Sequence, residues 1–238
     1  MEINIAKTKH VKFAPFTRVT SVQYKIRGIT IDTASSIKYL GVLLTSNLSW
    51  NTHIEHITTK ACKKLGYLKR HLHLANTDTR LRAYSSLIRP SLEYASIIWH
   101  PHHSNLTNLL ESVQNKAARF ISSSYSRYQS VSALKKSLNL SSLDMRRKLT
   151  RLSFFHSLFH SNIPFARAHI LPAAHISTRT DHIHKVKPIF ARTNLYQNSP
   201  LVLSIAEWNS LPSNIVSLTE SSSFHAALLT FLECVNLS

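Results

Sequence analysis

The chain has 238 residues, of which 43% are hydrophobic, and 29 Lys and Arg against 11 Asp and Glu give it a formal net charge of +18. It can therefore bury a sizeable core, and charge spread along its whole length favours a polyanionic partner, most simply nucleic acid, over a basic protein whose charge serves solubility alone. No apolar run approaches the ~18 residues of a membrane span, and two distant cysteines cannot form a disulfide framework, so both of those classes are excluded.

Residues 1–48 carry most of the strand signal and two of the three glycines, Gly28 and Gly41. Apolar and polar side chains alternate over residues 22–31 on either side of a turn at Gly28, which predicts a β-hairpin. A hairpin this small is marginal alone, so we expect a larger sheet. Either residues 37–44 complete that sheet, or part of it lies outside the chain.

Residues 49–125 change to helical periodicity. Apolar side chains recur at steps of three and four from residue 54 to residue 68, which predicts a long helix. Thr52 followed three positions later by Glu55 is a capping box, and we expect it to open this helix. Trp50 stands at the junction, so its ring should pack in the crease between strands and helix.

Two further helices are predicted in this region. Asp78 should cap the first of them, and Pro90 should kink or split it, because a proline lacks the amide hydrogen and its ring collides with the preceding turn. Ser104 or Asn105 should cap the second, which ends at a serine-rich joint over residues 122–124.

Residues 126–238 are predicted to form a helical C-terminal region. A short helix over 131–138 is followed by a longer one that Ser141 or Ser142 caps. Four cations should form a solvated basic face on this longer helix: Arg146, Arg147, Lys148 and Arg151. Prolines make residues 161–200 irregular before a terminal amphipathic helix.

Several of these segments carry ordered blocks that resemble one family. The blocks are residues 2–13, Ile37-Lys38-Tyr39-Leu40-Gly41-Val42 with Trp50 and His53-Ile54, residues 84–99, residues 110–121, and Trp208-Asn209 with Leu211-Pro212. Together they resemble the reverse transcriptases of non-LTR (LINE-like, jockey-type) retrotransposons, from late in the palm to the C-terminus. The resemblance covers nearly the whole chain.

The resemblance implies an α+β fold that is mainly α. Residues 1–48 would be a small antiparallel remnant of a polymerase palm, with strands similar to motifs D and E. Residues 49–125 would be the helical thumb, and residues 126–238 a C-terminal helical region with an irregular stretch at 161–200.

The catalytic centre of such a polymerase needs paired aspartates that hold two Mg²⁺ ions. The four aspartates here stand apart in the sequence: Asp32, Asp78, Asp144 and Asp181. We therefore expect a truncated reverse transcriptase that binds template–primer but does not polymerise alone, with no cofactor of its own, although a full-length relative would use Mg²⁺. The alternatives are a stand-alone basic RNA- or DNA-binding module and a non-functional transposon remnant.

The resemblance also implies where RNA and DNA would bind. Lys38, Tyr39 and Gly41 are similar to a primer-grip element, and Lys7 is similar to the motif D lysine that lies near the incoming nucleotide. Positive side chains on the helices would track phosphates without reading bases: Lys60, Lys63, Lys64, Lys69, Arg146 and Arg147. The alternative for each lysine is a solvated surface side chain, and for Tyr39 and Gly41 it is sheet packing.

Other chemistry finds little support in the sequence. Of fifteen histidines, His156 and His160 stand one helical turn apart, but Ser157 breaks the metalloprotease pattern and no cysteine pair exists, so no metal site is expected. There is no Gly-x-Ser-x-Gly elbow, and three glycines cannot build a phosphate loop. Without a signal peptide, the protein is expected to be intracellular, nuclear or cytoplasmic, and not secreted.

Overall fold

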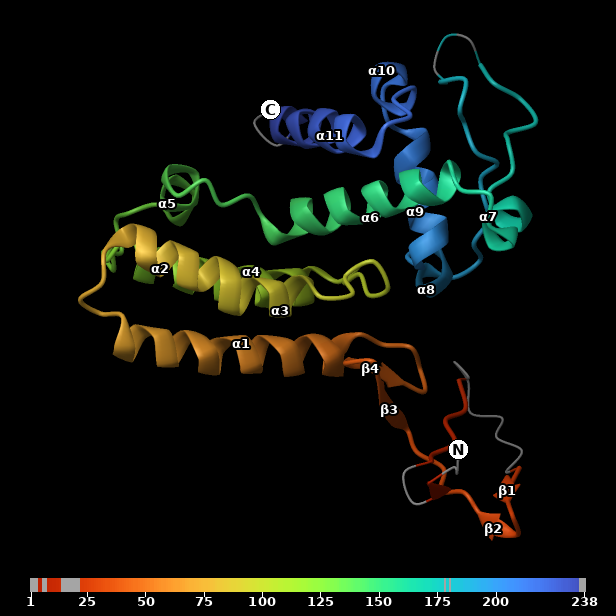
Figure 1. The fold of residues 1–238 in the computed structure, drawn as a ribbon, viewed down its shortest axis with the longest axis horizontal. Helices are drawn as coiled ribbons and strands as arrows, with labels where there is room; N and C mark the ends of the chain where they lie inside the picture. Colours follow the sequence, from red (N-terminus) through yellow and green to blue (C-terminus); the bar gives the residue numbers. More distant parts are fainter. Residues whose placement is uncertain (1–3, 6–7, 14–21, 178, 180, 236–238) are drawn as a thin grey trace.

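The computed structural model describes residues 4–5, 8–13, 22–177, 179 and 181–235 (Figure 1). Helices dominate it, and its strands form two small hairpins at one end of the molecule, so the α+β, mainly α class is confirmed. One group of helices, α1 to α4, adjoins the hairpins, and α6, α9 and α11 form a second group beside it.

The two hairpins do not share a sheet in the described part of the chain. β1 (Lys25–Ile26) pairs with β2 (Ile29–Thr30), and β3 (Ser36–Tyr39) pairs with β4 (Val42–Thr45), both antiparallel. Of the two alternatives, the one in which residues 37–44 complete the sheet of the first hairpin is therefore wrong for the described residues. β1 and β2 bury almost nothing, whereas β4 buries Val42 in the core that α1 shares, so the second hairpin packs on the helices and not on the first hairpin.

The first long helix, α1 (Asn51–His71), follows the predicted pattern but not the predicted cap. Its apolar stripe is buried as expected: Ile54, Ile57, Ala61, Leu65 and Leu68. Trp50 is the N-cap residue, and its carbonyl oxygen accepts the first helical bond, from the Ile54 amide at 2.9 Å. Thr52 thus lies inside the helix, where its hydroxyl caps nothing, and the capping-box prediction is wrong.

Pro90 splits the next helix as predicted. α2 (Thr77–Ala83) passes into one π-helical turn, η2 (Tyr84–Ile88), and then into α3 (Arg89–Glu93) with Pro90 in its first turn. A π turn widens the backbone locally, which accommodates a ring that cannot join the regular hydrogen-bond ladder.

The other caps differ in part from the predictions. Asn76, not Asp78, caps α2, because its side-chain oxygen accepts the Thr79 amide hydrogen at 2.8 Å. α4 (Ser104–Ile121) has His103 at its N-cap position and no side-chain cap bond. Ser142 does cap α6, accepting from the Met145 amide.

In the part of the chain that the structure describes, seven helices follow α4: α5 (Val131–Ser137), α6 (Leu143–Phe159), α7 (Pro164–His169), α8 (Asn194–Gln197), α9 (Pro200–Asn209), α10 (Ser213–Val216) and α11 (Ser221–Val235). Two apolar cores result. The first joins β4, α1, η2, α3, α4 and α5, and the second joins α6, α9, α10 and α11 around Trp208 and Phe224. α6 connects them, since Leu143 belongs to the first core and Met145 to the second.

The predicted solvated basic face of α6 is wrong. Arg147 and Arg151 are each 1% exposed, and Arg146 pairs with Glu93 of α3. The Arg151 guanidinium holds the Glu207 carboxylate of α9 with two bonds of 2.8 and 2.7 Å. Neighbouring elements cover α6 on this side, so these charges are neutralised inside the protein rather than solvated.

Candidate nucleic-acid interface

The β3–β4 hairpin is fixed to the first core through His53 and Trp99. His53 Nδ1 accepts the Leu43 amide hydrogen at 3.3 Å, and its ring meets the Trp99 ring edge-on at 5.3 Å between centroids. Trp99 is fully buried and donates from Nε1 to the Tyr94 carbonyl oxygen at 2.9 Å. Strand, helix and the segment after α3 therefore form one packed joint.

The tip of this hairpin is held from a distant part of the sequence. Leu40 and Gly41 both have positive φ, +45° and +88°, as a two-residue type I′ turn requires. Tyr94 donates from its hydroxyl to the Leu40 carbonyl oxygen at 2.9 Å, and a Cβ at position 41 would come within 3.2 Å of the Tyr94 ring. The turn thus needs a glycine, and it presents Lys38, Tyr39 and Leu40 to solvent.

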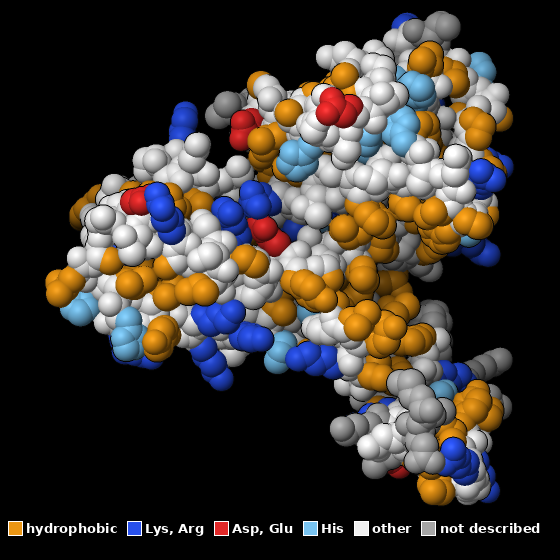
Figure 2. Space-filling view, in the orientation of Figure 1, with side chains coloured by type: hydrophobic (Ala, Val, Ile, Leu, Met, Phe, Trp, Pro, Cys, Tyr) orange, Lys and Arg blue, Asp and Glu red, His pale blue; other side chains and the backbone are white. Residues whose placement is uncertain are grey.

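The outer face of α1 carries a polar and basic stripe. Its exposed side chains recur at steps of four and three: His56, Lys60, Lys63, Tyr67 and Arg70. Figure 2 shows Lys and Arg side chains along this edge of the molecule. The side chains project from one helix face, so a linear polyanion could meet several of them at once.

Two of the four predicted lysines of α1 leave that stripe. Lys64 is half-buried and donates from Nζ to the Leu87 carbonyl oxygen at 3.0 Å. Lys69 is half-buried on the opposite flank, with its Nζ 5.9 Å from the centre of the Tyr125 ring. Of the predicted set, Lys60 and Lys63 therefore belong to the outer stripe.

A groove between α1 and α4 adds Lys116, a lysine outside the predicted set of binding residues. It has a volume of about 400 Å³ and is lined by Thr58, Thr59, Cys62, Lys63, Leu109, Ser112, Val113 and Lys116. Lys116 is exposed there, on the same groove as Lys63. Its position beside buried Val113 and Ala117 placed it at the flank of the apolar stripe, but the partner helix could not be identified from periodicity.

The remaining predicted residues are not at this surface. Arg147 is buried, which lowers the pKa of its guanidinium, and it bonds Asp144 at 3.0 Å. The hydrogen bond to Glu93 raises the pKa of Arg146. Neither arginine lies on α1, and Arg147 has no access to a phosphate in this structure. Lys7 lies outside the described residues.

Burial also lowers the pKa of two histidines at this joint, His53 and His100. Desolvation, with the nearby His56 as a smaller cause, lowers the pKa of His53 to about 4. Desolvation, followed by the charge of Arg151, lowers the pKa of His100 to about 4. His100 Nδ1 lies 3.2 Å from Arg151 Nη1, a geometry that requires this nitrogen to accept and the ring to be neutral.

We expect stability to fall as the pH drops from about 6.5 to about 4. In that window His53 and His100 bind protons in the unfolded state but not in the folded state. Each therefore lowers the free energy of unfolding by up to about 1.4 kcal/mol per pH unit, and neither lowers it above pH 6.5. His53→Asn keeps an acceptor for the Leu43 amide but cannot titrate, so its slope should be smaller. Urea unfolding at several pH values, with exposed His56→Asn as control, measures this; an unchanged slope for His53→Asn would contradict it.

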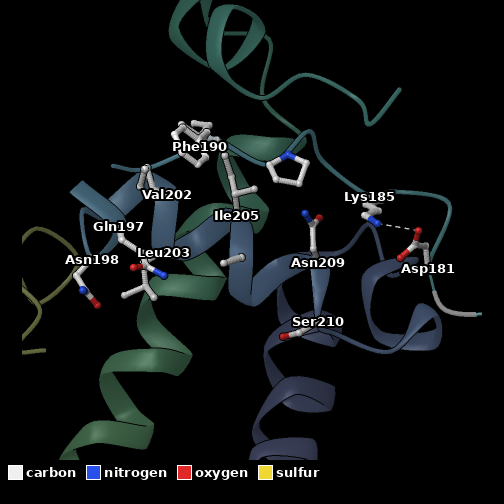
Figure 3. Close-up of a pocket in the computed structure, with 14 residues that line it drawn as sticks. Asp181, Lys185, Phe190, Gln197, Asn198, Val202, Leu203, Ile205, Asn209 and Ser210 are labelled. Atoms are coloured by element: carbon white, nitrogen blue, oxygen red, sulfur yellow. Dashed lines mark ion pairs between the residues drawn. The ribbon is translucent and has the colours of Figure 1, made fainter. Parts of the chain in front are cut away.

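A further pocket lies away from α1, in the C-terminal region. It has a volume of about 830 Å³ between residues 181–191 and helices α8 and α9 (Figure 3). Phe190, Val202 and Ile205 give it an apolar wall, and the Asp181–Lys185 ion pair of 2.7 Å lies at one end. Its described lining includes no histidine that could act as a base.

The described residues contain no group of three or more His, Cys, Asp or Glu side chains placed to hold a metal ion. Among the same residues, no helix is both long and apolar enough to cross a membrane.

Comparison with known proteins gives one informative match. The chain is 27% identical over 122 residues to a probable RNA-directed DNA polymerase from transposon X-element of Drosophila melanogaster. The matched half of the chain is thus a region related to the reverse transcriptases of non-LTR retrotransposons. This confirms the resemblance drawn from the sequence for that half. The match covers 50% of this chain but only 13% of the fly transposon polymerase, and no family model and no solved structure matches.

Proposed function

We propose that this retrotransposon-related chain binds the sugar–phosphate backbone of template–primer nucleic acid as the thumb and primer grip of an RNA-directed DNA polymerase. The observation that carries the proposal is the basic stripe on α1, next to the anchored β3–β4 hairpin, in a chain related to such a polymerase. Lys60 and Lys63 would contact phosphates from the stripe, and Lys116 would contact them from the groove.

The chemistry of the surface supports backbone contact without sequence readout. Lysine ammonium groups are point charges that neutralise phosphates wherever they meet them, and no base-reading motif accompanies them. Lys38 and Tyr39 would extend the contact onto the hairpin, whose tip Tyr94 and Gly41 hold in one conformation. A tip fixed in advance loses little conformational entropy when it binds.

We also propose that the chain does not polymerise DNA alone. Three of its four aspartates are engaged in ion pairs with nearby cations: Asp78 with Arg82, Asp144 with Arg147 and Asp181 with Lys185. Polymerisation needs carboxylates that hold Mg²⁺ together, and a full polymerase would supply them from its palm.

Replacing Lys60 and Lys63 together by alanine should weaken binding of an RNA–DNA hybrid duplex about tenfold, equally for different sequences, because two phosphate contacts are lost. Stability should be unchanged, since both side chains are exposed. Fluorescence anisotropy with labelled duplexes measures the affinity.

The matched control is Lys136→Ala with Lys187→Ala. These side chains are also exposed, and the pair removes the same charge from α5 and from the irregular segment. Affinity should stay within about twofold for this control. Equal losses in both double variants, or no loss in either, would contradict a binding surface on α1.

A further inference from the structure

A second candidate surface lies at the far end of α1, where the chain passes from α4 to α5. Tyr125 is 61% exposed and Tyr128 is 100% exposed, and Arg127 between them is exposed as well. The Tyr128 ring has no packing inside the protein, and most of the Tyr125 ring faces solvent, so two exposed rings flank a cation here. We call Lys69, Arg119, Tyr125, Arg127 and Tyr128 the tyrosine platform.

The loop that carries the platform is held in place at several points. Arg119 donates from Nη1 to the Ser126 carbonyl oxygen at 2.9 Å. Arg80 bonds the Phe120 carbonyl oxygen at 3.1 Å and the Ser123 hydroxyl, and Ser123 has a positive φ of 50°. The start of the loop is therefore tied to α4 through Arg119 and to α2 through Arg80.

The positive charge of the platform is not neutralised within the protein. Lys69 lies over the Tyr125 ring in a cation–π contact, and Arg119 donates to a neutral carbonyl oxygen. No ion pair of the described residues includes Lys69, Arg119 or Arg127. These three cations therefore remain available to an anion.

We propose that the tyrosine platform binds single-stranded nucleic acid, with one or two bases stacked on Tyr125 and Tyr128 and the phosphates held by Lys69, Arg119 and Arg127. Exposed rings beside unpaired cations match the two parts of a nucleotide, a flat base and an anionic phosphate. The strand must be single, because the bases of a duplex are already stacked on one another and offer no free face.

The rings of the platform belong to the α4–α5 connection, whereas the lysines proposed to contact the duplex belong to α1 and α4. Figure 1 places the α4–α5 connection at the end of α1 that is away from the hairpins. α1 has 21 residues, so the platform and the hairpin are about 30 Å apart. The inference therefore goes beyond the template–primer function. A variant can lose single-strand binding and still bind the duplex.

The test is the full chain with Tyr125→Ala and Tyr128→Ala together, titrated with a fluorescein-labelled oligouridylate and, separately, with a blunt RNA–DNA hybrid. We expect about ten- to a hundredfold weaker binding of the oligouridylate, because stacking is lost, and duplex affinity within about threefold of the parent. Both rings are exposed, so circular dichroism should show an unchanged fold.

The Tyr125→Phe, Tyr128→Phe pair keeps both rings and should bind the oligouridylate nearly as the parent does. Tyr196→Ala, which removes a ring that is 48% exposed on α8, should also have no effect. Unchanged oligouridylate binding in the alanine pair overturns the platform, as does an equal loss in the phenylalanine pair or an equal loss of duplex affinity. Failure of the proposed function would give a different result, namely duplex binding that does not change in the Lys60→Ala, Lys63→Ala variant.

Discussion

Trp99→Ala should lower the free energy of unfolding by about 3–5 kcal/mol, because a fully buried indole leaves a cavity in the first core. The variant also loses the bond from Nε1 to the Tyr94 carbonyl oxygen and the edge-on contact with His53. Chemical denaturation near neutral pH, followed by circular dichroism, measures the loss.

Trp50→Ala is the matched control for this prediction. Its indole is only half-buried at the start of α1, so the loss should be clearly smaller than for Trp99. A larger loss for Trp50 than for Trp99 would show that the crease between hairpin and helix, rather than the buried joint behind it, supports this end of the molecule.

Glu207→Ala should lower the free energy of unfolding by about 3–5 kcal/mol, because it leaves the Arg151 guanidinium buried without its carboxylate. The Arg151 side chain is 2% exposed, so water cannot replace both lost bonds. His100 offers one neutral acceptor at 3.2 Å, which does not compensate a full charge. Thermal and urea unfolding of the variant measure the effect.

Two comparisons make that prediction specific. Asp78→Ala removes one partner of an exposed pair and should cost at most about 0.5 kcal/mol. Replacing both members, Arg151→Met with Glu207→Leu, should recover most of the lost stability, since no buried charge remains. If the double variant is as unstable as Glu207→Ala, the loss comes from packing and not from the uncompensated arginine.

Periodicity in the sequence was sufficient to predict the helices but not to predict which elements pack against them. The stripe from Ile54 to Leu68, the break at Pro90 and the cap at Ser142 follow from local rules, and the structure confirms them. Arg151 was expected in solvent because its partner, Glu207, is 56 residues away in the sequence. Local patterns carry no information about such a pairing.

In the candidate site, too, local patterns predicted exposure on a helix but not contacts between distant parts of the sequence. The exposure of Lys60 and Lys63 follows from the helix period, but the contacts that remove Lys64 and Lys69 from the stripe come from η2 and from the α4–α5 loop. The Tyr94 bond that anchors the hairpin tip spans 54 residues. Thr52 failed as a cap because the helix begins at Asn51, two residues earlier than the motif implies, so that Trp50 is the N-cap residue.

The salt dependence of hybrid-duplex binding tests the central claim most directly. The affinity of the parent chain should fall with a log–log slope steeper than about −2, because several phosphates are neutralised, and the Lys60→Ala, Lys63→Ala variant should be shallower by about one to two units. A parent affinity that does not change with salt, or a variant slope equal to that of the parent, would contradict a nucleic-acid interface on α1.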